Sequence, residues 1–74
     1  MDAVYEKQIG ANIRRLRMER GLTQDQVSAK LQVRGCDVTR SALAKIEVGQ
    51  RHVYVDELKA LREIFDVSYE ELFV

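Results

Sequence analysis

The sequence predicts an all-α domain of five short helices, and three features indicate this class. Threonine or serine caps mark helix starts at three places, no alternating strand pattern competes, and the chain contains no proline. Between Leu22 and Arg51 the sequence LTQDQVSAKLQVRGCDVTRSALAKIEVGQR contains two helical patterns joined by a glycine-containing turn. This arrangement is typical of a helix-turn-helix, whose second helix enters the DNA major groove.

The first and fourth helices are predicted from apolar spacing. A stripe of residues at three- and four-residue spacing predicts a first helix from about Val4 to Arg20, ended by Gly21; the stripe comprises Tyr5, Ile9, Ile13 and Leu16. A broad apolar face predicts a fourth helix from Val55 to Phe65, formed by Leu58, Leu61, Ile64 and Phe65. Its cap is weak, because Tyr54 stands where a serine or threonine is expected.

Capping boxes mark the starts of the other three helices. A complete box with a hydrophobic staple, which predicts the second helix, is formed by Leu22, Thr23, Gln26 and Val27. The same arrangement at Val67, Ser68, Glu71 and Leu72 predicts the fifth helix. A partial box at Val38, Thr39 and Leu43, where Ala42 replaces the box partner, predicts the third.

Length and composition indicate a single domain over residues 1–74, because 74 residues with 46% hydrophobic content form one small core. The sequence contains no membrane span, signal peptide or lipidation motif, which predicts a cytoplasmic protein. The helix-turn-helix pattern adds the expectation that it associates with the nucleoid in a prokaryote or phage. One cysteine, one histidine and no glycine-rich phosphate loop provide no catalytic constellation. We therefore expect no enzyme activity, no metal site and no cofactor.

Charge is segregated along the chain although the formal net charge is zero. Residues 1–51 carry ten Lys/Arg against six Asp/Glu, a balance of +4, whereas residues 52–74 carry two against six, a balance of −4. Such asymmetry attracts phosphates to one end of a molecule and repels them from the other.

These motifs together resemble the phage-repressor and Cro-like family of helix-turn-helix regulators, the xenobiotic-response-element type. The resemblance covers nearly the whole chain and rests on Ile9, Gly10, Ile13, Leu16 and Arg17, followed by LTQDQVSAKL, VTRSALAKIEVGQR and VSYEELF. It implies a compact five-helix, lambda-repressor-like DNA-binding domain. It favours a transcriptional repressor that binds double-stranded DNA as a dimer on a roughly palindromic operator.

One departure from the family concerns the segment between the second and third helices. Leu31 to Thr39 encloses seven residues, Gln32 to Val38, where the family has three or four. The second helix either runs an extra turn to Arg34 with Gly35 as a left-handed cap, or stops near Leu31 with the insertion bulging outward. We favour the first, because Gly35 lies where such a cap belongs.

The third helix, from about Arg40 to Val48, carries the predicted base contacts. At 100° per residue, Arg40, Ser41, Ala44, Lys45 and Val48 share an arc of roughly 140°, opposite the apolar residues that pack. Arginine and lysine donate to guanine, and serine bonds several bases. By similarity to the family, Arg40, Ser41, Ala44 and Lys45 face the bases, with Arg40 the first choice for guanine; the alternative is an ordinary solvated helix face.

Phosphate contacts are predicted at the helix ends. Gln24 lies in the first turn of the second helix, where backbone N–H groups attract anions, and the family places a phosphate-binding glutamine there. Thr23 and Thr39 are caps that can also approach the DNA backbone. Arg51 and His52, just beyond the third helix, are further candidates, although His52 fits an ordinary loop histidine equally well.

The resemblance assigns Arg17 and Glu47 to a structural ion pair between the first and third helices. We expect dimerisation to use the domain itself through Tyr69, Phe73 and Val74, although these residues also fit closure of the monomer core. Control would come from abundance or a regulatory protein partner. The alternative function is a helix-turn-helix protein-interaction module, antitoxin-like or an adaptor.

Overall fold

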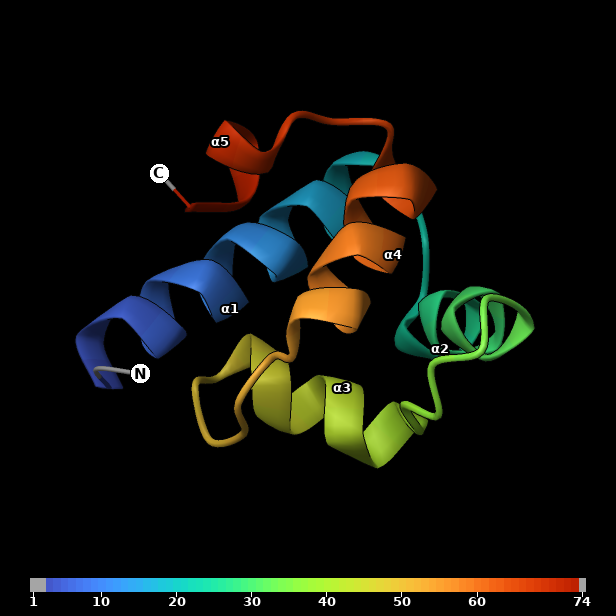
Figure 1. Cartoon of the computed structure of the whole chain (residues 1–74), viewed down its shortest axis with the longest axis horizontal. Coiled ribbons are helices and arrows are strands. Elements are labelled where there is room, and N and C mark those ends of the chain that lie inside the picture. Colours follow the sequence, from blue (N-terminus) through green and yellow to red (C-terminus); the bar gives the residue numbers. More distant parts are fainter. Residues whose placement is uncertain (1–2, 74) are drawn as a thin grey trace.

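The computed structural model describes residues 3–73, and within this range the chain forms five helices and no strand. They are α1 (Ala3–Glu19), α2 (Gln24–Val33), α3 (Arg40–Glu47), α4 (Val55–Phe65) and α5 (Tyr69–Phe73) (Figure 1). The predicted all-α class is therefore confirmed, and α4 has the predicted bounds. None of the described helices has the length and apolar content needed to cross a membrane.

The core draws residues from all five helices, as expected if each apolar stripe faces the centre. Helix α1 packs against α3, α4 and α5, while α2 packs against α3 and α4 (Figure 1). The most deeply buried large side chains are Phe65, Ile13, Leu16, Leu31, Leu43, Ile46, Leu61, Leu72, Val27 and Val38. The short α5 is fastened to α1 by Leu72 and by Asn12 Nδ2, which donates to the Leu72 carbonyl at 2.9 Å.

The predicted stripe of α1 is wrong at its amino-terminal end. Tyr5 is 61% exposed, whereas its neighbour Glu6 is 9% exposed. The partners of this turn come from the segment after α3: His52 contacts the Glu6 carboxylate, and Lys7 approaches Gly49. Helical periodicity alone does not reveal that a polar loop, and not an apolar surface, covers this end of the helix.

The extra turn of α2 forms as the favoured alternative predicted. The helix continues to Val33, Arg34 is its C-cap, and Gly35 has a positive φ of 82°. The N–H of Gly35 donates to the Gln32 carbonyl at 3.0 Å and that of Cys36 to the Leu31 carbonyl at 3.0 Å. These two bonds make a Schellman motif, which needs a left-handed residue at Gly35. The inserted residues thus lengthen a helix and leave a short turn before α3.

The predicted caps of α2 and α3 are present. Thr23 Oγ1 accepts from the N–H of Gln26 at 3.1 Å, and Gln26 Oε1 accepts from the N–H of Thr23 at 2.8 Å. Thr39 Oγ1 accepts from the N–H of Ala42 at 3.1 Å. The end of α4 has no glycine: Asp66 adopts the left-handed conformation with φ 55°, and the N–H of Val67 donates back to the Arg62 carbonyl. Aspartate tolerates this conformation better than most residues.

Helices α1 and α3 cross at Gly10, where their backbones come close together. A Cβ on Gly10 would overlap the carbonyl oxygen of Ile46 and lie 3.1 Å from the carbonyl carbon of Glu47. Glycine at this position therefore fixes how closely α3 sits against α1.

Candidate nucleic-acid interface

The outward face of α3 consists of small and basic side chains. Arg40, Ser41, Lys45 and Val48 are exposed and Ala44 is half-buried, while Leu43 and Ile46 are buried on the opposite side. The structure thus places the four predicted base-contact residues on one accessible face. Val48 is the only large apolar side chain exposed on α3 or its C-cap. A groove in DNA suits such a face better than an apolar protein surface does.

A buried carboxylate joins three helices beneath this face. Glu47, at the end of α3, is 4% exposed; its carboxylate accepts from Arg17 Nε at 2.7 Å and from Arg17 Nη2 at 3.0 Å. The remaining Arg17 nitrogen, Nη1, donates to the Leu22 carbonyl at 2.9 Å. The hydrogen bond to Glu47 is the main reason that the pKa of Arg17 is raised above its usual value. The pair assigned by family resemblance is therefore a bidentate bridge between α1 and α3.

Gln24 belongs to the same network. It is the first residue of α2, its side chain is half-buried, and its Nε2 donates to Glu47 Oε1 at 3.0 Å. Sequence reasoning did not identify this bond, because Gln24 and Glu47 lie 23 residues apart. The bond holds the amino terminus of α2 beside the carboxyl end of α3 and orients the glutamine side chain.

An open cleft of about 530 Å³ lies in front of this network. It is lined by residues of α1, the α1–α2 turn and the starts of α2 and α3: Arg14, Arg17, Gly21, Leu22, Thr23, Gln24, Asp25 and Arg40. The charge of Arg17 is balanced by Glu47, so Arg14 and Arg40 against Asp25, together with the N–H groups at the start of α2, make the cleft suited to an anion. Arg14 was missed from the sequence, although its spacing of three residues from Arg17 puts both on one face of α1.

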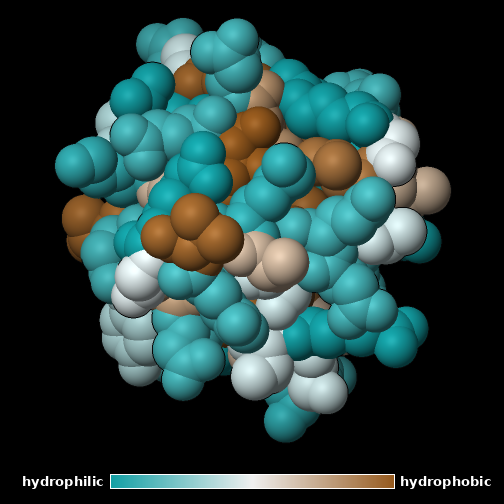
Figure 2. All heavy atoms as spheres, turned by 90° about the vertical axis from the view of Figure 1, so that its right-hand side faces the viewer, coloured by the Kyte–Doolittle hydropathy of each residue, from teal (hydrophilic) through white to brown (hydrophobic). Residues whose placement is uncertain are grey.

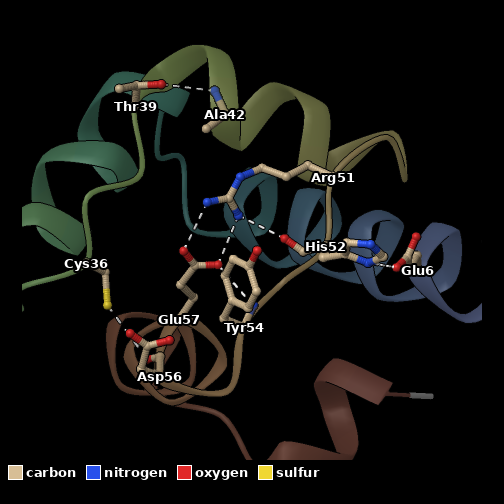
Figure 3. Close-up of polar contacts among 9 residues, drawn as sticks. All are labelled: Glu6, Cys36, Thr39, Ala42, Arg51, His52, Tyr54, Asp56 and Glu57. Carbon is tan, nitrogen blue, oxygen red and sulfur yellow. Dashed lines mark hydrogen bonds and ion pairs between the residues drawn. The ribbon is translucent and has the colours of Figure 1, made fainter. Parts of the chain in front are cut away.

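The other predicted phosphate contacts have partners within the protein (Figure 3). Thr39 is exposed and caps α3. Arg51 forms a bidentate pair with Glu57, and Nδ1 of His52 contacts the Glu6 carboxylate from an exposed position. Of the predicted phosphate residues, Thr23 and Gln24 line the cleft, whereas Arg51 and His52 lie in the segment after α3.

Two of the predicted dimer residues, Tyr69 and Phe73, lie on α5, away from α3 (Figure 1). Tyr69 is 45% exposed and Phe73 is 47% exposed, while Leu72 between them is buried. The Arg62 guanidinium stacks 5.1 Å from the centre of the Tyr69 ring. Val74, the third predicted residue, lies outside the described residues.

Acidic residues occur on the side of the molecule that faces away from α3. The acidic residues Glu70 and Glu71 belong to α5, which lies on the opposite side of the molecule from α3 (Figure 1). On the face that contains α2, hydrophilic side chains predominate and hydrophobic atoms show in smaller areas between them (Figure 2).

Cys36 is a structural thiol in the turn before α3. It is 6% exposed, and its Sγ lies 3.7 Å from the Asp56 carbonyl oxygen in the first turn of α4. Burial raises the pKa of the thiol, and the carboxylates of Asp56 and Glu57 raise it further. The thiol is therefore protonated at neutral pH and unsuited to nucleophilic chemistry. No group of three or more potential metal ligands occurs in the described part of the chain.

Comparison with known proteins agrees with this geometry. A helix-turn-helix family model matches residues 13–72, which span the carboxyl-terminal part of α1, helices α2 to α4 and all but the last residue of α5. The chain belongs to the Cro/C1-type helix-turn-helix family. Its similarity to the uncharacterized HTH-type transcriptional regulator y4dJ of Sinorhizobium fredii (strain NBRC 101917 / NGR234) is 36% identity over 66 residues, 89% of this chain and 79% of that protein.

Two solved structures share the fold over nearly their whole length. The DNA-binding domain of BldD has a TM-score of 0.82 and 32% identity, with 100% of both chains covered. The restriction-modification controller protein C.AhdI from Aeromonas hydrophila has a TM-score of 0.81 and 28% identity, with 96% of both chains covered. The family membership identifies the chain as a helix-turn-helix regulator in which α2 and α3 form the motif.

Proposed function

We propose that the protein is a sequence-specific double-stranded DNA-binding repressor whose α3 lies in the major groove. The observation that carries this proposal is the accessible face of Arg40, Ser41, Ala44 and Lys45 beside the arginine-lined cleft. Small residues let a helix approach the base edges, and Arg40 and Lys45 donate to guanine. Repression would require only that the bound protein covers an operator that overlaps the promoter. Acting on DNA places the protein in the cytoplasm, at the nucleoid.

Phosphates on either side of the groove would meet the ends of the motif. The cleft receives one phosphate through the N–H groups at the start of α2, with Thr23, Gln24 and the additional Arg14 around it. Thr39, at the start of α3, and His52, after its end, would meet others. These contacts set the orientation of the domain, whereas α3 reads the sequence.

Substitution of Arg40 and Arg14 tests these two roles. Fluorescence anisotropy with selected and random duplexes over a salt series measures affinity, and wild-type protein should bind the selected site about 10³-fold or more tighter. Arg40→Ala should cost about 1–3 kcal/mol of discrimination at one base pair per half-site. Arg14→Ala should weaken binding to all DNA sequences by the same factor. It should also lower the slope of log affinity against log salt concentration by about one.

Gln24→Ala should also weaken binding to all DNA sequences by the same factor. Because it removes the hydrogen bond to Glu47 as well, Arg14→Ala is the better test of a phosphate contact. Lys59→Ala removes the same charge from an exposed position on α4 and serves as the control. Absence of binding by the wild type at low salt would refute the proposal. Equal, uniform losses from Arg40→Ala and Arg14→Ala would contradict the assigned roles.

Dimerisation through α5 would place two copies of α3 in successive major grooves about 34 Å apart, on a palindromic operator. Its support is the pair of exposed aromatic rings of Tyr69 and Phe73 on a helix remote from α3.

Phe73→Asp should convert the dimer to monomer, because a charge in an apolar interface is costly. Sedimentation equilibrium measures the change. Val33→Asp, at a position 86% exposed on α2, should leave a dimer; equal loss from both variants, or a monomeric wild type, would contradict this interface.

A further inference from the structure

The segment between α3 and α4 is organised around one buried carboxylate (Figure 3). Glu57, in the first turn of α4, is only 6% exposed. Its oxygens accept from Arg51 Nη1 at 3.0 Å and Nη2 at 3.1 Å, and Oε1 also accepts from the N–H of Tyr54 at 3.0 Å. Glu57 therefore holds the middle of the segment through Arg51 and its end through the backbone of Tyr54.

Arg51 also makes contacts within the segment itself. Its Nη1 also donates to the carbonyl of the next residue, His52, at 2.8 Å, and its guanidinium lies 5.6 Å from the centre of the Tyr54 ring. The hydrogen bond to Glu57 is the main reason that the pKa of Arg51 is raised. The side chain is thus a bridge from the loop to α4 and keeps its charge.

This geometry conflicts with a phosphate contact by Arg51. Three of the five guanidinium N–H groups are engaged inside the protein, two with Glu57 and one with the His52 carbonyl. Moving the side chain out to a phosphate would leave the buried carboxylate without its partner, which is costly. While the pair is intact, its two charges cancel and contribute little to attraction of DNA. The exposed residues of the segment between α3 and α4 are Val48, Gln50, His52 and Tyr54.

We infer that Arg51 is a positioning residue for DNA binding: through Glu57 it holds the loop that follows α3, and it contributes no phosphate contact. The inference rests on the proposed DNA-binding function and replaces the role predicted for Arg51 from the sequence. Loss of the bridge should misplace the exposed loop residues and the end of α3 relative to the DNA backbone.

Glu57→Gln separates the two roles by the sign of its effect. The substitution raises the net charge by one and releases Arg51, so a phosphate-contacting arginine would bind DNA equally well or more tightly. A positioning arginine predicts weaker binding, by about fivefold or more, the level at which a single interface residue counts as important. Glutamine keeps an oxygen that can accept from the Tyr54 N–H, so the helix cap is retained.

The experiment measures anisotropy with the selected duplex over a salt series, at a temperature where circular dichroism shows every variant folded. The double variant Arg51→Met/Glu57→Gln keeps the wild-type net charge and strands no charge. We expect it to bind about fivefold or more weakly with the wild-type salt slope, in contrast to Arg14→Ala, whose slope falls by about one. Arg51→Lys with Glu57 intact should restore part of the affinity.

Three results would overturn the inference: a slope lowered by about one in the double variant, tighter or unchanged binding by Glu57→Gln, or unchanged affinity of the double variant. Absence of DNA binding by the wild type at low salt would instead refute the proposed function itself. The two failures are therefore distinguishable.

Discussion

Glu47→Ala is expected to unfold the domain before any change in DNA specificity becomes measurable. The substitution strands Arg17, whose side chain is only 12% exposed, and removes the acceptor of Gln24 Nε2. Breaking one partner of a buried ion pair costs about 3–5 kcal/mol. Native proteins have a total stability of roughly 5–15 kcal/mol and domains of this size lie at the low end, so this loss removes a large part of it.

Thermal unfolding followed by circular dichroism measures this effect. Glu63→Ala, at an exposed position of α4, removes the same charge and should change stability by less than about 0.5 kcal/mol. Glu47→Gln keeps the size of the side chain, so its loss of stability should lie between those of Glu47→Ala and Glu63→Ala. A melting temperature of Glu47→Ala equal to that of the wild type would refute the structural role of the pair.

Gly10→Ala is expected to destabilise the domain although alanine favours helix. Inside α1, alanine is better than glycine by about 1 kcal/mol in intrinsic propensity. The added Cβ would overlap the Ile46 carbonyl oxygen, and that atom belongs to backbone that cannot rotate away. Overpacking of this kind costs about 1–3 kcal/mol and occasionally more, so we expect a net loss of stability.

Chemical denaturation with urea measures the sign of this change. Gln8→Ala, at an exposed position on the same helix, should have little effect on stability. Because Gly10 sets the distance between α1 and α3, folded Gly10→Ala should also bind DNA more weakly than wild type. An increase in stability, as helix propensity alone predicts, would show that α1 and α3 are farther apart than this structure places them.

The helices could be predicted because their signals are local. The capping box at Thr23 and Gln26 and the glycine at position 35 each act within a few residues, and α2 starts and ends as they predict. The same is true of the apolar spacing of α4. The end of α4 at Phe65 was also predicted, although its left-handed cap is Asp66 and not a glycine.

The accessible face of α3 could also be predicted, because helical periodicity and one buried side are enough to define it. The polar network behind it was only partly predicted. The Arg17 and Glu47 pair came from family resemblance, whereas the bond of Gln24 to Glu47 and the cleft position of Arg14 depend on where α1, α2 and α3 meet.

The sequence by itself determined that this protein is a five-helix helix-turn-helix domain with a small, basic outward face on its third helix. Caps, glycines and apolar periodicity act over one or two helical turns, so they can be recognised from the sequence alone. Only the tertiary structure decided that Glu6 is buried instead of Tyr5, and that Arg51 is bound to a buried Glu57. The physical reason is that burial and pairing of a polar side chain depend on which distant segment covers it.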